Sequence, residues 1–158
     1  MPTPLKKTYT EQEALARAAA LCSAGEQCVS QIEEKLARWG QDAEAQARII
    51  AHLIAEKYID ESRFARAYAL DKSRYSGWGR VKIGMYLRHL GISEADRREA
   101  LAQLPADEYR DTLARILAAK ARSVKAATPY ERRAKLIRFA LGRGFEMEEA
   151  LRAVKGAE

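Results

Sequence analysis

The 158-residue sequence has few histidines and cysteines, two residue types that are common at catalytic and metal sites. It has two histidines and two cysteines, and Cys22 and Cys28 have no second cysteine pair with which to complete a zinc site. It contains no glycine-rich phosphate loop, no nucleophile elbow and no His-Glu-x-x-His motif. We therefore expect no enzyme activity, no cofactor and no metal ion.

Long apolar runs are also missing. No window approaches the roughly 18 consecutive apolar residues of a membrane-spanning helix. Lys6 and Lys7 are followed by polar residues rather than by the apolar segment of a signal peptide. Together with the low cysteine count, these absences predict a cytoplasmic protein that does not engage a membrane.

Proline and aromatic residues are scarce, with four prolines and 8% aromatics, whereas alanine, arginine and glutamate are abundant. This composition favours α-helices. Helix starts are marked by Thr10 with Glu13, which form a capping box, and by Asp42, Asp60 and Ser93 as N-caps. No alternating pattern typical of strands extends beyond four residues. The fold class is therefore predicted to be all-α.

One pattern of two apolar residues and a glycine, each four positions apart, occurs three times. Its members are Ile32, Leu36 and Gly40; Ile83, Leu87 and Gly91; and Leu136, Ala140 and Gly144. Each glycine is expected to end a helix in the left-handed conformation. The helices that follow are expected to bury Ile49, Ile50, Leu53 and Ile54 in the first copy, Ala100, Leu101 and Leu104 in the second, and Ala150, Leu151 and Val154 in the third.

A period near 50 residues with three helices per unit is typical of a repeat protein. We predict three tandem three-helix repeats that form an elongated, curved array. The expected divisions are a flexible leader at 1–9 and repeats at 10–60, 61–106 and 107–158. The alternative is a chance recurrence within an alanine-rich helical chain.

Charge is distributed unevenly along the chain, whose formal net charge is +6. Residues 1–60 carry 7 basic and 9 acidic side chains, whereas residues 61–158 carry 21 basic and 13 acidic ones. Two segments, 62–92 and 110–143, together hold 17 basic residues against 3 acidic ones. Such segments can neutralise phosphates, and interleaved aromatic rings can stack on unpaired bases. Ordinary solvated helix faces are the alternative interpretation.

The candidate contacts to nucleic acid or to a nucleoprotein filament are twelve basic residues and one tryptophan from these segments. They are Arg63, Arg66, Lys72, Arg74, Trp78, Arg80, Lys82, Arg88, Arg132, Arg133, Lys135, Arg138 and Arg143. Asp60 and Phe64, which lie beside them, are better explained as a helix cap and a core anchor.

Two stretches of the sequence resemble signature elements of the RecX family. The first is carried by Tyr58, Asp60, Arg63, Phe64 and Ala65, and the second by Gly79, Lys82, Ile83, Leu87, Arg88, Gly91 and Ile92. The chain departs from the family pattern at Lys57, Glu61, Gly84 and Tyr86. The resemblance covers roughly residues 12–155 and is strongest over 50–92.

The resemblance implies three tandem three-helix repeats and a non-enzymatic regulator of the RecA recombinase. Such a protein binds RecA and its single-stranded DNA filament, with duplex DNA as a further candidate partner. It inhibits ATP hydrolysis, strand exchange and co-protease activity, and so modulates homologous recombination, DNA repair and the SOS response. A monomer is expected. Two alternatives stay open: a helix-turn-helix transcription regulator, and a helical scaffold without a DNA role.

Overall fold

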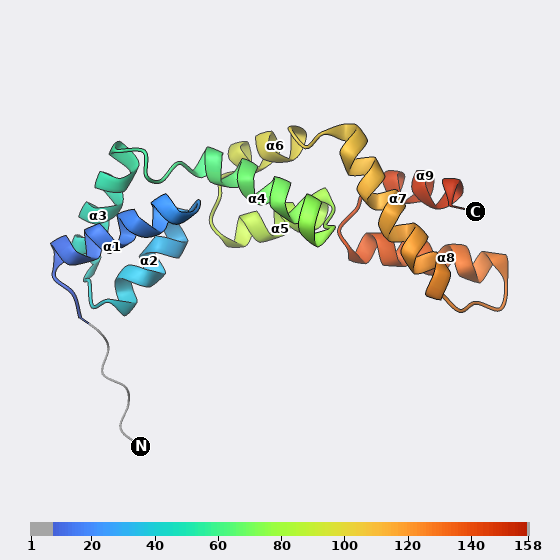
Figure 1. Cartoon of the computed structure of the whole chain (residues 1–158), viewed down its shortest axis with the longest axis horizontal. Coiled ribbons are helices and arrows are strands. Elements are labelled where there is room, and N and C mark those ends of the chain that lie inside the picture. Colours follow the sequence, from blue (N-terminus) through green and yellow to red (C-terminus); the bar gives the residue numbers. More distant parts are fainter. Residues whose placement is uncertain (1–7, 158) are drawn as a thin grey trace, which may run out of the picture.

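The computed structural model describes residues 8–157, and within them the chain forms α-helices and no strand (Figure 1). The helices are α1 (Glu11–Ala24), α2 (Val29–Arg38), α3 (Ala43–Ala55), α4 (Glu61–Ser76), α5 (Arg80–His89), α6 (Glu94–Ala102), α7 (Ala106–Ser123), α8 (Pro129–Gly142) and α9 (Met147–Gly156). The predicted all-α fold class is confirmed. None of the helices in this part of the chain is long and apolar enough to cross a membrane.

The helix starts follow the predicted caps. The Thr10 hydroxyl accepts a hydrogen bond from the Glu13 amide at 3.2 Å, and the Glu13 carboxylate accepts one from the Thr10 amide at 3.0 Å. The side chains of Asp42, Asp60 and Ser93 each accept from the amide three residues later. These bonds satisfy amides that have no partner inside the helix, so local sequence alone sets these starts.

The three predicted repeat glycines adopt the same left-handed turn. Gly40, Gly91 and Gly144 have φ angles of +81°, +82° and +93°. In each copy the residue after the glycine donates its amide to the carbonyl of the buried residue four before the glycine, at 3.0, 3.1 and 3.1 Å. This arrangement is a Schellman-type helix end. It turns the chain sharply, so that the third helix of each unit packs back onto the first two.

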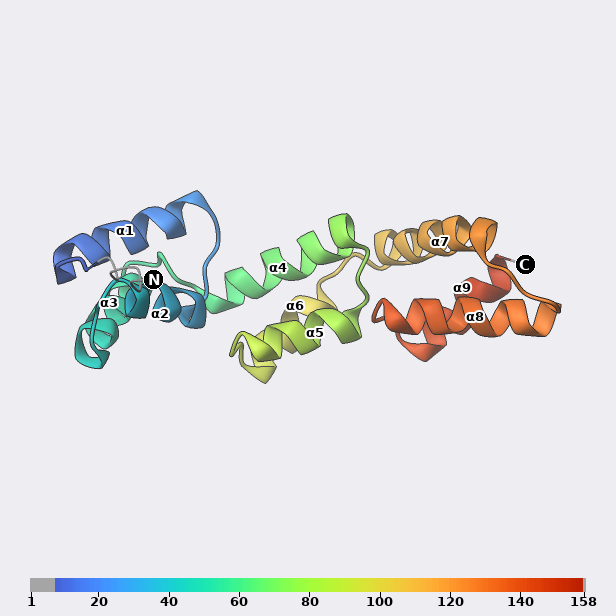
Figure 2. The same ribbon diagram turned by 90° about the horizontal axis from the view of Figure 1, so that it is seen from below.

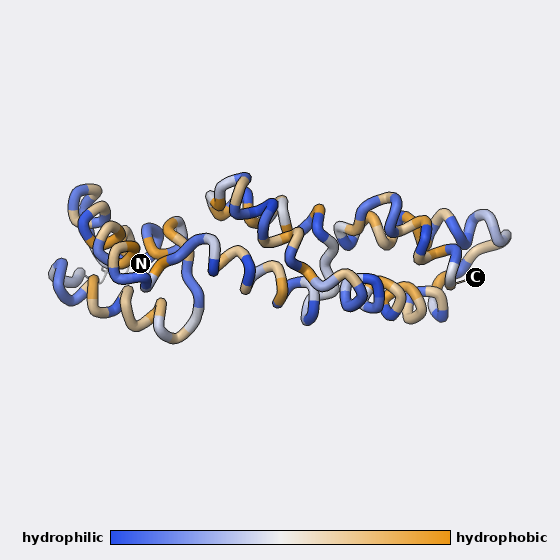
Figure 3. Tube along the Cα trace, turned by 90° about the horizontal axis from the view of Figure 1, so that it is seen from above, coloured by the Kyte–Doolittle hydropathy of each residue, from blue (hydrophilic) through white to orange (hydrophobic). Residues whose placement is uncertain are grey.

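The helices group into three consecutive triplets that follow one another along the long axis of the molecule (Figures 1 and 2). Hydrophobic and hydrophilic residues are interspersed along the helices, as Figure 3 shows, and each helix buries only part of its residues. The first triplet has its own core, which includes Ile32, Leu36 and Leu53. The second and third triplets share one continuous core.

Two junctions join the triplets. At the first, Cys28 at the start of α2 is buried in the core of the second triplet, and the Ser30 hydroxyl donates to the Leu90 carbonyl at 2.7 Å. Arg63 adds an ion pair to Glu26 at 2.5 Å. The second junction is built from backbone contacts and is described below, because it positions most of the basic residues.

Two expected core residues are exposed. Ile54 on α3 and Leu151 on α9 keep 49% and 50% of their surface accessible, so their assignment to the core was wrong. Each follows a residue that is buried, Leu53 and Ala150 respectively. Adjacent helical positions are about 100° apart, so only one of the two can point into a narrow core.

The predicted leader comprises residues 1–9, of which residues 1–7 lie outside the described part of the chain. Tyr9 is described, and its amide donates to the carbonyl of Trp39 at 3.1 Å. The two rings meet edge-on with their centroids 5.8 Å apart. The chain before α1 is therefore held against the end of α2 at this point.

Candidate nucleic-acid interface

Direct backbone pairing fixes the second triplet against the third. The amide of Gly79 donates to the carbonyl of Arg143 at 2.8 Å, and the amide of Val81 donates to the carbonyl of Gly144 at 2.9 Å. The loop before α9 thereby caps the first turn of α5, whose amides lack helical partners. A Cβ atom on Gly79 would overlap the backbone of Gly144. Only glycine at this position allows the two chain segments to come so close.

A buried tyrosine reinforces this junction. The Tyr109 hydroxyl on α7 accepts the amide of Arg80 at 3.0 Å and donates to the carboxylate of Glu146. The Arg80 guanidinium closes the arrangement, 3.0 Å from Glu146 and 3.9 Å from the centre of the Tyr109 ring. Burial and the bond to Glu146 raise the pKa of Tyr109 well above its ordinary value. The hydroxyl therefore stays protonated and keeps donating.

Beside this junction lies a group of cations and rings on α4, α5 and the loop between them, which we call the Trp78 cluster: Lys72, Trp78, Lys82 and Tyr86. The ammonium nitrogens of Lys72 and Lys82 lie 4.8 and 4.5 Å from the centroid of the Trp78 ring. The Tyr86 ring packs at a tilt, with its centroid 4.8 Å from that of Trp78. Such cation–π contacts hold positive charge and aromatic surface at one place.

A second basic site is the groove between the C-terminal half of α7 and α8, which we call the α7–α8 groove. It encloses about 460 Å³ and is lined by Lys120, Lys125, Lys135, Arg138, Phe139, Ser123 and Val124. The ammonium nitrogen of Lys120 lies 5.2 Å from the centroid of the Phe139 ring. Lys135 donates to the Lys125 carbonyl at 2.5 Å and pairs with Glu131 at 3.1 Å. Four of the seven lining residues are cationic and none is acidic, so the groove suits an anion.

Several predicted contact residues are engaged inside the chain. Arg63 bonds Glu26 and two backbone carbonyls, Arg66 bonds Ser62 and Glu99, and Arg80 belongs to the junction. Arg74 on α4 reaches Glu108 on α7 at 2.5 and 3.2 Å. That ion pair raises the pKa of Arg74 and lowers that of Glu108. These side chains hold the array together as well as contributing positive charge.

The predicted residues on α8 lie on two sides of that helix. Lys135 and Arg138 line the α7–α8 groove, whereas Arg132 and Arg133 line a separate pocket of about 280 Å³ with Leu136 and Val154. The second pocket lies between α8 and α9. Arg88 is exposed on α5, and Arg143 ends α8 with its guanidinium carbon 5.6 Å from the Phe139 ring. A single flat ligand therefore cannot touch all thirteen candidates.

The structure adds candidates that sequence reasoning did not select. Lys120 and Lys125 were counted within the basic segment but were not chosen, and Tyr86 was noted only as a departure from a family pattern. The sequence held a signal for them, because each is a cation or a ring within a basic stretch. Which of them share a groove depends on how α7 and α8 pack, and spacing along one helix does not reveal that.

No group of three or more His, Cys, Asp or Glu side chains in residues 8–157 is arranged to hold a metal ion. The features that stand out are basic and aromatic instead. Three-helix units in tandem, with cations and rings concentrated on the second and third units, define an all-helical repeat protein with a cationic surface.

Comparisons with known proteins show to which family this repeat protein belongs. The family models for the second and third three-helix domains of RecX match residues 60–101 and 107–154. Among curated relatives, the regulatory protein RecX of Halorhodospira halophila is 31% identical over 131 residues, covering 81% of this chain and 78% of the relative. That of Chlorobaculum tepidum is 30% identical over 126 residues, covering 80% and 76%. The chain therefore belongs to the RecX family, whose members carry the name of a regulatory protein.

A solved structure has the same architecture. The crystal structure of RecX from Lactobacillus salivarius superposes with a TM-score of 0.82 and covers 93% of this chain and 96% of its own. Sequence identity in that comparison is 17%, so it establishes the shared fold alone. The predicted array of helical repeats is thus also the fold of a solved structure with a very different sequence.

Proposed function

We propose that this chain is a non-enzymatic regulator that binds the RecA recombinase on single-stranded DNA. In this proposal it lowers ATP hydrolysis, strand exchange and co-protease activity, and it modulates recombination, DNA repair and the SOS response. Membership of a family of regulatory proteins supports the proposal.

The observation that carries the DNA part of the proposal is the concentration of cations and rings in two places. The Trp78 cluster offers two lysines over an indole ring, and the α7–α8 groove offers four cations around Phe139. Phosphates are bound by such cations with release of counterions. Aromatic side chains at the same places suit the unpaired bases of a single strand.

The first repeat has the opposite character and is our candidate for contact with the recombinase itself. Residues 1–60 carry more acidic than basic side chains. Glu33, Glu34 and Glu44 are exposed on α2 and α3. Negative charge there disfavours phosphate, so this repeat is free to face protein.

The direct test is the rate of DNA-dependent ATP hydrolysis by preformed recombinase filaments, with and without the chain. We expect the chain to slow hydrolysis. No effect at several-fold molar excess of folded protein would contradict the proposal. A footprint on one particular duplex sequence would instead favour a transcription regulator.

A further inference from the structure

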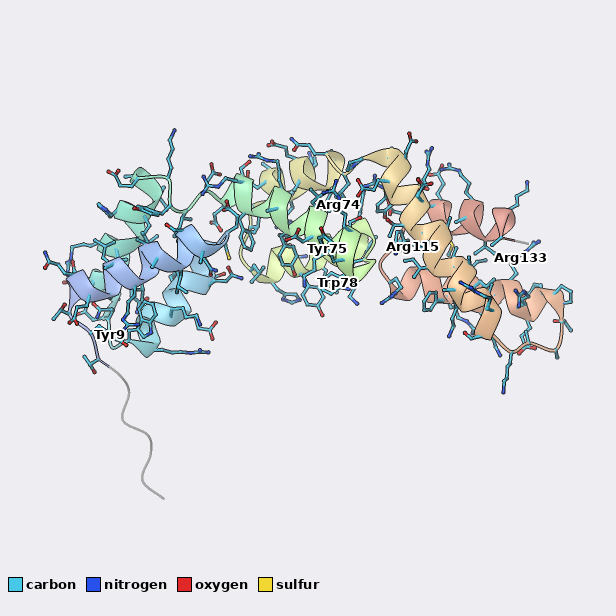
Figure 4. The ribbon with its side chains drawn as sticks, viewed as in Figure 1. Tyr9, Arg74, Tyr75, Trp78, Arg115 and Arg133 are labelled. Carbon is cyan, nitrogen blue, oxygen red and sulfur yellow. The ribbon has the colours of Figure 1, made fainter. Side chains whose placement is uncertain are left out.

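A small pocket at the junction of the second and third repeats is surrounded by arginines. It encloses about 220 Å³, and its lining includes Arg74 from the end of α4, Arg115 from α7 and Arg143 from the end of α8. Tyr75, Ser76 and Gly77, at the C-terminus of α4, also line it. Figure 4 shows Arg74, Tyr75 and Arg115 close together where the two repeats meet.

The positive charge of this pocket is only partly neutralised. Arg74 is paired with Glu108. Arg115 and Arg143 have no carboxylate within ion-pair distance among residues 8–157, and the Nε atom of Arg143 is buried there without a hydrogen-bond partner. A buried donor that lacks an acceptor costs stability. Three guanidinium groups around one small cavity therefore favour the entry of an anion.

The pocket is preorganised. Arg143 is fixed through its own carbonyl, which accepts the Gly79 amide, and Gly77 holds a left-handed φ of +66° that ends α4 beside it. Arg74 is held across the junction by Glu108. Because these backbones and the Arg74 side chain are fixed, the ordering cost of binding an anion falls mainly on the exposed side chain of Arg115.

Tyr75 provides an exposed aromatic ring beside this pocket. Its ring is 83% exposed, among the most exposed large hydrophobic side chains in the described residues. An aromatic ring in water next to a phosphate-sized basic pocket matches the pairing of base and phosphate in a single strand. The neighbouring Trp78 ring has Lys72 and Lys82 packed against it and is only partly exposed, whereas Tyr75 is open.

We propose that this pocket binds one phosphate of single-stranded DNA between Arg74, Arg115 and Arg143, and that an adjacent base stacks on Tyr75. The proposal rests on the DNA-binding part of the proposed function and deepens it. It places the strand across the junction of the second and third repeats, between the Trp78 cluster and the α7–α8 groove.

The test is fluorescence anisotropy of a labelled oligothymidylate with the full chain and no recombinase. The variants are Arg115→Ala, Tyr75→Ala and Tyr75→Phe. Arg98→Ala is the matched control, because Arg98 is an exposed arginine on α6 and its loss changes the net charge equally. Tyr75→Ala should weaken binding about 5-fold or more, the loss of one stacked base. Tyr75→Phe and the control should bind like the wild type.

Arg115→Ala should weaken binding and should reduce the salt slope by about 0.7, the value for one lost phosphate contact. On a strand with abasic sites the effect of Tyr75→Ala should vanish while that of Arg115→Ala persists. Wild-type affinity in both alanine variants, or an equal loss in Arg98→Ala, would overturn the proposal. ATP that displaces the strand as well as a competing oligothymidylate does would show that free nucleotide is the ligand, and would overturn it too.

The pocket proposal and the proposed regulatory function can be contradicted independently of each other. If the wild type leaves ATP hydrolysis unchanged but Arg115→Ala and Tyr75→Ala still lose oligothymidylate, the regulatory function is wrong and the pocket stands. If hydrolysis slows but both variants bind DNA normally, the pocket is wrong and the regulatory function stands.

Discussion

At the scale of single residues, the start of α4 shows how one short stretch serves folding. Asp60 caps the helix by accepting the Arg63 amide at 3.0 Å. Phe64, one turn later, is 4% exposed and stacks on Tyr68 with centroids 5.7 Å apart. The residues that resemble the family signature here are therefore needed for the fold. Their presence alone does not mark a binding site.

Replacing Phe64 by alanine tests its anchoring role. The substitution removes a buried ring from the core shared by the second and third repeats, so it should cost roughly 3–5 kcal/mol of unfolding free energy. Urea denaturation followed by circular dichroism would measure this. Tyr75→Ala removes a ring that is 83% exposed and serves as the control with little change expected. Wild-type stability in Phe64→Ala would rule out the anchor.

The Asp60 cap should also give a pH-dependent contribution to stability. The amide of Arg63 holds the pKa of this carboxyl below its ordinary value of 3.8. A lowered pKa in the folded state means that the contribution is present above that ordinary value and is lost as pH falls through the lowered one. Asp60→Ala should therefore cost about 1 kcal/mol near neutral pH. The difference from wild type should shrink in acid, and an unchanged difference at both pH values would argue against the charged cap.

Caps and repeat glycines could be predicted from sequence because their contacts lie within a few residues. The bond from Glu13 to Thr10 and the turn at Gly40 are examples. The edges of the apolar faces could not be predicted in this way, since Ile54 and Leu151 have buried neighbours but are exposed themselves. Whether the edge of an apolar face is covered depends on where the next helix lies, and that is a property of the packed array.

At the scale of helices, α8 divides its basic residues between two grooves. Arg132 and Arg133 line the pocket toward α9, whereas Lys135 and Arg138 face α7. The sequence predicted the charge of this segment but not its division, because the division follows from which helices flank α8. A mutation set confined to one groove is therefore more informative than one chosen along the sequence.

Charge reversal in the α7–α8 groove tests the helix-scale assignment. Lys120→Glu, Lys125→Glu and Arg138→Glu together should weaken binding to bare single-stranded DNA and should flatten its salt dependence by about 0.7 per lost contact. The matched control is Arg132→Glu with Arg133→Glu in the other pocket. The groove variant should lose more affinity for each charge reversed. Equal losses per charge would mean that overall charge, not the groove, governs binding.

The glycine contact between α5 and the α8–α9 loop yields a second helix-scale prediction. Gly79 has a φ angle of −85°, which alanine adopts readily, so Gly79→Ala tests steric overlap alone. It should cost roughly 1–3 kcal/mol and speed hydrogen exchange of the Val81 amide, which bonds Gly144. Gly142→Ala, at an open helical position on α8, is the control and should be neutral or slightly stabilising. Unchanged exchange at Val81 in Gly79→Ala would contradict the rigid junction.

At the scale of the whole molecule, the array combines two kinds of connection. The second and third repeats share a core and a backbone-paired junction, so the Trp78 cluster and the α7–α8 groove belong to one continuously packed unit. The first repeat has its own core and joins through Cys28, Ser30 and the pair of Arg63 with Glu26. This division matches the charge division along the chain. It supports a model in which the basic repeats follow DNA and the acidic repeat faces protein.

The most direct test of this account is the rate of ATP hydrolysis by preformed recombinase filaments in the presence of three proteins. These are the wild type, the α7–α8 groove variant, and a first-repeat variant with Glu33, Glu34 and Glu44 changed to lysine. The account predicts that the wild type slows hydrolysis and that both variants slow it less. Only the groove variant should also lose affinity for bare single-stranded DNA. A wild-type chain that leaves hydrolysis unchanged at several-fold excess would contradict the account.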